Sequence, residues 1–485
     1  MCDIVKSRST GRQMYNKERD LQGKEEMRQQ DRLSLSARDC SGPKGLERGW
    51  WPEVSRCYET AKVTNSSYSK SSNHTRMKQS TAHRTDPAPR SYLLRVLSRL
   101  LICSTLILAL SVALKSRSRL SLLLPHFSTK VEIMAYQQER YIAELAVQRA
   151  CLLTQKVFFE KAKGTVSKDD KSPVTIGDFG AQALIISAIR KNFPNDEIVA
   201  EEEASSLRED KDLSAEIWRL VKDIKLDDEE SDNILGGPLA SEQSMLEIID
   251  NGNSAGGPSG RIWALDPIDG TKGFLRGGQY AVCLGLMVDG DVKVGAIGTP
   301  NLPVDDAASL DASTGAQQAA TTANGVLFSA VLGEGATSRP LASGTLAASK
   351  SISMRPVSNI SEAVFCEGVE AAHSAQGDNA AVAQLLGITA PSVRLDSQAK
   401  YCSIARGAGD IYLRLPVKKD YQEKIWDHAA GDLLVREAGG QVTDIYGNRL
   451  DFSKGRTLAA NKGVVASPKA HQDAVVGAVK SVLKL

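Results

Sequence analysis

The sequence lacks Cys-x-x-Cys pairs, and its cysteines do not have the spacing that metal ligands require. The 8 cysteines are scattered along 485 residues. An isolated cysteine inside an apolar run, such as Cys283, behaves as a small core residue. The absence of paired cysteines argues against a zinc cluster and a disulfide framework, and it suits a reducing compartment. We therefore expect a cytoplasmic protein.

The sequence also lacks an apolar run of bilayer length. Residues 100–114 are largely apolar and lie between basic residues, but a membrane-spanning helix needs about 20 residues. The segment begins too late for a secretory signal, which occupies roughly the first 15–30 residues. Three interpretations remain: a marginal membrane anchor, a late organelle-targeting segment, or sequence that is not translated in the main product. Membrane contact is expected only through this segment, so an anchored or organelle-targeted protein is the alternative to a cytoplasmic one.

Charge divides the chain into two parts of opposite sign. Residues 1–133 contain 24 Lys and Arg against 12 Asp and Glu, whereas residues 134–485 contain 36 against 46. The first 90 residues are rich in Ser, Arg, Lys, Gln and Asn with few apolar clusters, which predicts disorder. The acidic remainder argues against a nucleic-acid polymer as ligand but is compatible with a small anion bound through a metal. We expect a basic, mostly disordered N-terminal extension joined to an acidic, enzyme-like body.

The body is predicted to be an α/β protein in two halves, residues 134–303 and 304–485. The first half begins with a helix, a loop, a helix and a strand, and residues 204–260 are interpreted as a helix and a long loop over the site. Strands are predicted at 261–266, 279–288 and 292–300, with a hairpin turn at Asp289-Gly290. An Ala/Ser/Thr-rich stretch at 304–325 is interpreted as a surface insertion or the link between the halves. The second half alternates strands and helices, which favours a layered α/β structure.

The most informative motif is a pair of carboxylates, Asp266 and Asp269, on either side of a proline and next to Gly270. Apolar residues precede the pair, as at the end of a buried strand. Proline has no N–H to donate, and glycine lets the chain turn sharply and approach a ligand closely. The turn therefore directs two carboxylates, and a backbone carbonyl between them, toward one point, which suits Mg²⁺. A lone D-x-x-D is also typical of a capped turn with solvated acids, so other residues must decide.

Three further acids lie beside predicted elements. Glu201 follows the apolar residues 198–200 and marks the end of a strand. Asp178 lies at the start of a helical pattern, and Asp427 lies just before a helix that ends at Gly439-Gly440. Element ends can present ligands, and a helix N-terminus favours anions. For Asp178, the residues alone are equally compatible with an N-cap of the following helix.

Together these segments resemble the lithium-sensitive, magnesium-dependent phosphatase superfamily of inositol monophosphatase, and within it the 3′(2′),5′-bisphosphate nucleotidases. The shared motifs are Asp-Pro-Ile-Asp-Gly-Thr at 266–271 and Trp-Asp-His-Ala-Ala-Gly at 426–431. The strings at 270–276 and 395–401 are typical of the nucleotidase branch. The likeness extends from about Met134 to the C-terminus. It implies a five-layer αβαβα sandwich with the site between its halves. Ala200 departs from the family's usual glycine, which we expect to be tolerated.

The resemblance also implies a role for each candidate residue. The implied ligands of two or three Mg²⁺ ions are Glu201, Asp266, Asp269, Asp427 and the carbonyl of Ile268. Asp178 and Thr271 are the implied pair that activates the attacking water, and the N–H groups of Gly270 and Thr271 would hold phosphate oxygens. The implied nucleotide-binding residues are His373, Ser397, Lys400 and Arg414. By itself, His373 is more typical of a loop, and Lys400 and Arg414 are more typical of solvated surface positions, so only their joint match with the family supports the implied roles.

The expected activity is hydrolysis of the 3′-phosphate of 3′-phosphoadenosine 5′-phosphate to give AMP and phosphate, in sulfate assimilation. The sulfated analogue is a plausible second substrate. An inositol polyphosphate or monophosphate phosphatase is the alternative with the same metal site. An inactive nucleotide or redox sensor is the alternative of another class, and the complete set of carboxylates argues against it. We expect a monomer that binds a small bisphosphorylated nucleotide.

Overall fold

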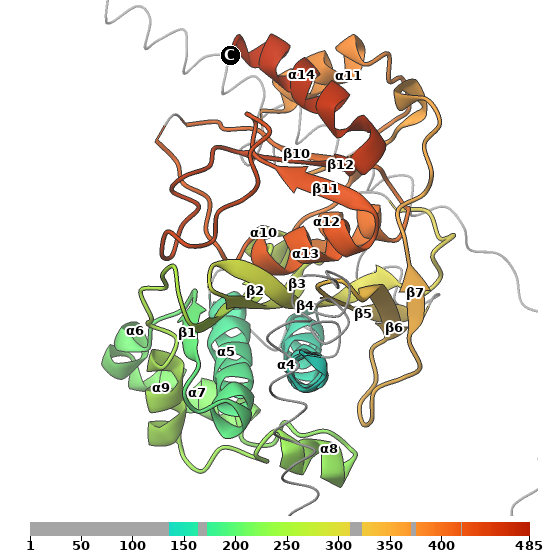
Figure 1. The fold of residues 1–485 in the computed structure, drawn as a ribbon. Helices are drawn as coiled ribbons and strands as arrows, with labels where there is room; N and C mark the ends of the chain where they lie inside the picture. Colours follow the sequence, from blue (N-terminus) through green and yellow to red (C-terminus); the bar gives the residue numbers. More distant parts are fainter. Residues whose placement is uncertain (1–134, 163–171, 311–322, 370–374, 419) are drawn as a thin grey trace, which may run out of the picture. The chain divides into compact units, whose positions relative to one another are not determined.

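The structure is a computed structural model that describes residues 135–162, 172–310, 323–369, 375–418 and 420–485 (Figure 1). The predicted basic extension, including its short apolar segment, lies outside these residues. Within them, no helix combines the length and the apolar character that crossing a membrane requires.

Two long helices, α4 (Gln137–Ala162) and α5 (Ser172–Asn192), cover one face of the first sheet (Figure 1). The spacing of Tyr141, Leu145, Ala146, Ala150 and Leu153 predicts one apolar face for α4, and the last four of these residues are fully buried. Apolar residues spaced three or four apart form one side of a helix. Tyr141, expected on the same face, is instead 42% exposed, because the buried stripe begins at Ile142.

In the described residues the first sheet has seven strands, which are neighbours in the order in which they occur along the chain. The strands are β1 (Glu197–Ala200), β2 (Arg261–Asp269), β3 (Ala281–Val288), β4 (Asp291–Pro303), β5 (Asn324–Val331), β6 (Gly335–Pro340) and β7 (Lys350–Ile352). β1 pairs with β2 in parallel, and every later pair is antiparallel. The predicted hairpin between β3 and β4 is confirmed, because Asp289 and Gly290 have φ angles of 51° and 78°.

The change from one sheet to the other does not occur at residue 304, where the sequence predicted the boundary between halves. β5, β6 and β7 continue the antiparallel run of the first sheet, so the change comes after Ile352. The Ala/Ser/Thr-rich stretch therefore lies between two neighbouring strands of one sheet. Its residues 311–322 lie outside the described part. Below, the first half means residues 135–352 and the second half residues 353–485.

Residues 204–260 form four helices in the described structure, and the prediction of one helix and a long loop is wrong. The helices are α6 (Ser205–Glu209), α7 (Lys211–Val221), α8 (Glu229–Ile234) and α9 (Glu242–Asp250). Three polar residues of this charged and Ser-containing stretch cap three of these helices. Asp210 and Asp228 accept hydrogen bonds from the first turns of α7 and α8, and Ser241 forms a capping box with Ser244.

The second half contributes a sheet and two pairs of helices. The second sheet has the order β11-β12-β10-β8-β9. Its strands are β8 (Phe365–Glu367), β9 (Val393–Arg394), β10 (Ile411–Arg414), β11 (Gly440–Thr443) and β12 (Val464–Pro468). Its α-helices are α11 (Gln376–Leu385), α12 (Ala399–Ala405), α13 (Ala429–Glu437) and α14 (Gln472–Leu483), with 3₁₀ turns at Ile360–Glu362 and Lys469–His471.

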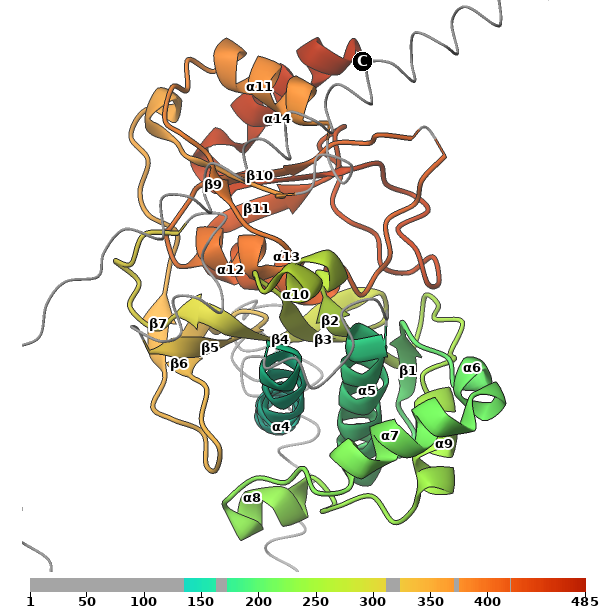
Figure 2. The same ribbon diagram turned by 180° about the vertical axis from the view of Figure 1, so that it is seen from behind.

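Helices and sheets alternate in five layers, as Figures 1 and 2 show from opposite sides. The helices α12 and α13 lie between the two sheets, and α11 and α14 lie on the outer face of the second. Buried apolar side chains fill each interface. The predicted αβαβα sandwich is therefore confirmed. The described cysteines, Cys151, Cys283, Cys366 and Cys402, are free and buried in this core.

Candidate active site

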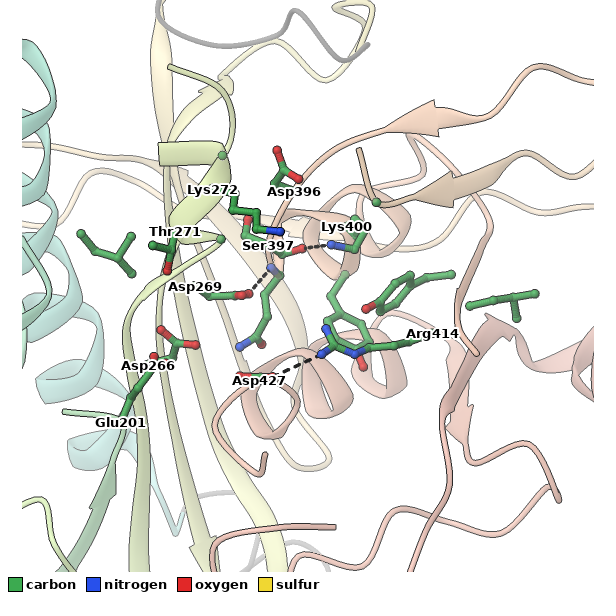
Figure 3. Close-up of a pocket in the computed structure, with 18 residues that line it drawn as sticks. Glu201, Asp266, Asp269, Thr271, Lys272, Asp396, Ser397, Lys400, Arg414 and Asp427 are labelled. Carbon is green, nitrogen blue, oxygen red and sulfur yellow. Dashed lines mark hydrogen bonds and ion pairs between the residues drawn. The ribbon is translucent and has the colours of Figure 1, made fainter. Parts of the chain in front are cut away.

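A pocket of about 250 Å³ lies where the end of β2 faces the second half (Figure 3). The first half contributes the β2–α10 turn and the residue after β1; α10 spans Thr271–Arg276. The second half contributes residues from the segment 396–401, residues of β10, and Asp427, which directly precedes the N-cap of α13. Ten of the predicted site residues line this pocket: Glu201, Asp266, Ile268, Asp269, Gly270, Thr271, Ser397, Lys400, Arg414 and Asp427.

The β2–α10 turn has the geometry that its sequence predicted. The pairing of β2 with β3 is irregular between Asp266 and Asp269, where the intervening proline has no N–H for the ladder. Gly270 follows with φ 89°, a left-handed conformation that favours glycine. A Cβ at this position would lie 2.8 Å from the Cβ of Ser397, so the glycine also allows the two halves to approach.

Asp178 lies inside α5 and does not cap it. The helix begins at Ser172, six residues earlier, so both the predicted position at the helix start and the N-cap interpretation are wrong. Asp178 is 4% exposed, and its Oδ1 atom has no hydrogen-bond partner. Among the described residues, no hydrogen bond joins Asp178 to Thr271. Asp178 is not among the pocket-lining residues, but its carboxylate interacts electrostatically with that of Glu201.

Burial and the neighbouring negative charges disfavour the ionised form of several carboxylates at the site. Burial raises the pKa of Asp266 well above its usual range, and the carboxylate of Glu201 raises it further. Desolvation, followed by the charge of Asp427, raises the pKa of Glu201 to about 8 and that of Asp269 to about 6. Burial also raises the pKa of Asp178 well above its usual range. The cluster therefore lacks enough positive charge from the protein itself.

These residues fit a hard divalent cation. The donor set consists only of carboxylate oxygens and the backbone at Ile268, which are the ligands that Mg²⁺ prefers. The Oδ1 atom of Asp266 is buried without a hydrogen-bond partner, and a buried polar atom of this kind requires an explanation. A cation among the carboxylates would satisfy that atom and favour their ionised forms.

One other group of ligand atoms lies close together in the described structure, formed by Glu423, Asp427 and His428, within 4.8 Å of one another. All three residues already have protein partners, and Asp427 is paired with Arg414. The Nε2 atom of His428 is 3.3 Å from Glu423 Oε2, and its Nδ1 is 2.8 Å from the Tyr401 hydroxyl. Arg414 Nε lies 2.7 Å from the same Glu423 oxygen. We therefore interpret this group as support for Arg414 and assign no ion to it.

The second half presents its site residues from a strained turn. Ser397 has φ 64°, which is uncommon for a residue other than glycine. Lys400 Nζ donates to the Ser397 carbonyl at 2.6 Å, and the Ala399 N–H donates to the Ser397 hydroxyl at 3.1 Å. The N–H of Gln398 donates to the Asp269 carboxylate across the interface between the halves. This turn therefore fixes one acid of the first half directly.

Lys400 and Arg414 do not have the solvated surroundings that the residue types alone suggested. Lys400 is 8% exposed, and its Nζ lies 5.2 Å from the centre of the Tyr412 ring. The Arg414 side chain is 21% exposed, and its Nη2 lies 3.7 Å from Asp427 Oδ2 (Figure 3). Two cations thus border the acidic cluster on the side of the second half.

Sequence reasoning missed several residues that belong to this site. Lys272 and Asp396 line the pocket, and Glu423 and His428 support Arg414. Lys272, Asp396 and His428 belong to the strings that carry the family resemblance, and Glu423 lies three residues before one of them, which was the available signal. His373, predicted to contact the nucleotide, lies outside the described residues.

Comparison with known proteins identifies the family. A sequence model of the inositol monophosphatase family matches residues 131–484. A 3′(2′),5′-bisphosphate nucleotidase of Emericella nidulans is 83% identical over 352 residues, which is 73% of this chain and 100% of that protein. One from Schizosaccharomyces pombe is 48% identical over 72% of this chain and 97% of that protein. An inositol monophosphatase structure from Anabaena aligns over 72% of this chain and 97% of its own, with 21% identity and a TM-score of 0.43. The chain belongs to the inositol monophosphatase family.

Proposed function

We propose that this protein is a Mg²⁺-dependent 3′(2′),5′-bisphosphate nucleotidase. It hydrolyses the 3′-phosphate of 3′-phosphoadenosine 5′-phosphate to give AMP and phosphate, a reaction that removes a by-product of sulfate assimilation. The observation that carries the proposal is a single pocket with two electrostatic zones, an acid cluster and a pair of cations formed by the buried Lys400 and the partly buried Arg414. The nucleotidase names of the two fungal relatives support the same substrate class.

The acid cluster would hold two or three Mg²⁺ ions through Glu201, Asp266, Asp269, Asp427 and the Ile268 carbonyl. Bound Mg²⁺ supplies charge neutralisation of the phosphate and a lowered pKa for a coordinated water. The protein brings these ligands from both halves, so the ion site requires the interface between them. The N–H of Gln398, which donates to Asp269, orients one ligand from the opposite half.

Asp178 and Thr271 are the residues proposed to handle the proton of the attacking water. Thr271 is exposed at the first residue of α10, facing the pocket (Figure 3). Asp178 is buried with one carboxylate oxygen unpartnered, and this oxygen would accept a hydrogen bond from the threonine hydroxyl. The N–H groups of Gly270 and Thr271 would donate to phosphate oxygens at the same turn.

The cations would bind the second phosphate of the substrate. Arg414 presents a planar guanidinium that matches phosphate oxygens in a bidentate manner. Lys400 lies beside Ser397, whose hydroxyl could contact the nucleotide. A substrate with one phosphate would leave this zone unpaired, which is why a bisphosphorylated nucleotide fits better than an inositol monophosphate. The sulfated analogue retains an anionic group at this position and is a second candidate substrate.

The test is phosphate release from a panel of substrates at equal concentration, with Mg²⁺ and with a chelator. The panel contains 3′-phosphoadenosine 5′-phosphate, its sulfated analogue, inositol 1-phosphate and an inositol polyphosphate. We expect activity only with Mg²⁺ and the highest kcat/KM for the bisphosphorylated nucleotide. A higher kcat/KM for an inositol phosphate would assign the chain to the alternative activity. No release from any member would support the inactive sensor.

A further inference from the structure

Arg456 of the second half reaches into the first half and contacts it at the end of β1. Its Nη2 donates to the carbonyl of Ala200 at 2.6 Å, and its Nη1 donates to the carbonyl of Ser254 at 3.0 Å. A third, longer contact joins Nη1 to the carbonyl of Gly252 at 3.4 Å. The guanidinium of Arg456 therefore donates hydrogen bonds to three backbone carbonyls from two separate segments.

These carbonyls belong to one small structural unit around the end of β1. The Ala200 N–H donates to the Gly252 carbonyl at 2.8 Å, and the Ser254 N–H donates to the Ile198 carbonyl at 3.0 Å. Ala200 is the last residue of β1, and Glu201 is the next residue. Arg456 therefore fixes the backbone immediately before a candidate ion ligand.

The same guanidinium also contacts the segment that leads to Asp427. Its carbon lies 4.9 Å from the centre of the Trp426 ring, in cation–π contact. The Ile425 N–H donates to the Arg456 carbonyl at 3.2 Å, so the backbones of the two segments are paired as well. Trp426 directly precedes Asp427 in the sequence. Arg456 thus touches the residue before one candidate ligand in each half.

A close approach of two backbones makes this contact possible. Gly256 has φ 67°, and a Cβ at this position would lie 3.0 Å from backbone atoms of Gly455. A side chain larger than hydrogen would separate the loop of the first half from the residue that precedes Arg456. The glycine therefore lets the guanidinium reach the β1 carbonyls.

We propose that Arg456 is a positioning residue that sets the divalent-cation affinity of the site by fixing Glu201 and Asp427 relative to each other. The inference rests on the proposed ion site, but not on which substrate is hydrolysed. Lysine cannot replace it fully, because an ammonium lacks the planar fork that binds several carbonyls while stacking on an indole. Removing a group that does not bind the metal itself but orients its ligands typically lowers metal affinity or activity by roughly 10–100-fold.

Arg190 provides a matched control, because it contacts the backbone at the other end of the same strand. It lies in α5 and donates to the carbonyl of Asp196 at 2.6 Å, just before β1, and to the Asn251 side chain at 3.0 Å. Arg190 therefore clamps the start of β1, as Arg456 clamps its end. Its loss should destabilise the strand without moving the backbone next to Glu201.

The experiment measures Mg²⁺ and Mn²⁺ binding by titration calorimetry, together with Tm, for the full chain and for Arg456→Ala, Arg456→Lys and Arg190→Ala. We expect Arg456→Ala to bind the ions at least tenfold more weakly, Arg456→Lys to be intermediate, and Arg190→Ala to stay within threefold of wild type despite a lower Tm. Added ethylguanidinium should restore part of the affinity of Arg456→Ala and leave Arg190→Ala unchanged.

Two results would overturn the inference: wild-type ion affinity in both Arg456 variants, or an equal loss in Arg190→Ala. If Arg456→Ala does not fold, the lysine variant decides on its own. A wild-type protein that binds no divalent cation would overturn the ion site and this inference together. A protein that binds the ions but prefers inositol phosphates would overturn only the nucleotidase assignment.

Discussion

Replacing Arg414 with methionine is the sharpest test of how the pocket selects its substrate. The guanidinium borders the acid cluster, with Nη2 3.7 Å from Asp427 Oδ2, and it is proposed to bind the second phosphate of the substrate. A hydrogen bond to a charged group contributes about 1.5–3 kcal/mol. Its loss should lower kcat/KM for 3′-phosphoadenosine 5′-phosphate roughly ten- to hundredfold. Activity on inositol 1-phosphate should fall much less, because that substrate has no group at this position.

The design must separate selectivity from stability. Arg414 Nε lies 2.7 Å from Glu423 Oε2, and Glu423 has only 7% of its side chain exposed. Breaking a fully buried pair costs about 3–5 kcal/mol, and the partial exposure of Arg414 should reduce that cost. In the Arg414→Met variant, the Glu423 carboxylate is left buried without its cation. Adding Glu423→Gln removes this unpaired charge and should recover much of the lost stability without recovering substrate selectivity.

Arg394→Met is the control, since Arg394 Nη2 lies 3.9 Å from Glu367 Oε2 and outside the pocket. Kinetics on both substrates and denaturant unfolding would be measured for all variants. If Arg414→Met lowers kcat/KM for both substrates by the same factor, Arg414 is a structural residue and the two-zone account of selectivity is wrong.

Four further outcomes are expected. Asp269→Asn should lower kcat at least about a hundredfold by removing a charge from the ion site, and a rate within threefold of wild type would contradict the ligand assignment. Li⁺ should inhibit phosphate release at concentrations where Na⁺ does not, and equal insensitivity to both ions would count against the family behaviour. Protein starting at Met134 should retain full activity at saturating Mg²⁺, because the pocket-lining residues lie between positions 201 and 427, and a tenfold loss would refute this. Metal-free protein should lose stability as pH rises from about 5 to about 8. The pKa values of Glu201, about 8, and Asp269, about 6, exceed their unfolded values, so the native state binds more protons across this range. Mg²⁺ should reverse the loss in thermal scans, and a stability that rises with pH would contradict the shifts.

The acid cluster could be predicted from the sequence because its main ligands lie in short segments whose conformation is determined by neighbouring residues. The turn from Asp266 to Thr271 is specified by a proline and a glycine within a few residues, and the structure has the expected geometry. The position of Asp178 was wrong because the start of a helix depends on residues before the apolar pattern becomes clear. The four helices between residues 205 and 250 were missed because capping acids and serines also occur in loops.

Features that depend on distant contacts could not be read from the sequence. The assignment of β5–β7 to the first sheet depends on which strand edge is free for pairing after β4. The support of Arg414 by Glu423 and His428 appears only when β10 and the segment before α13 lie side by side. The burial of Lys400 depends on its packing against Tyr412, a contact between a helix and a strand.

The division of the pocket between the halves has a consequence for recombination within the family. Glu201, Asp266 and Asp269 belong to the first half, whereas Lys400 and Arg414 belong to the second. The proposed ion ligand Asp427 also belongs to the second half. A chimera that joins this first half to the second half of a relative with another substrate should therefore keep its ion requirement only if that relative has an acid at the position of Asp427, and it should take the substrate preference of that relative. Crossovers after Ile352 would leave both sheets whole, so this is where exchanged segments should be joined.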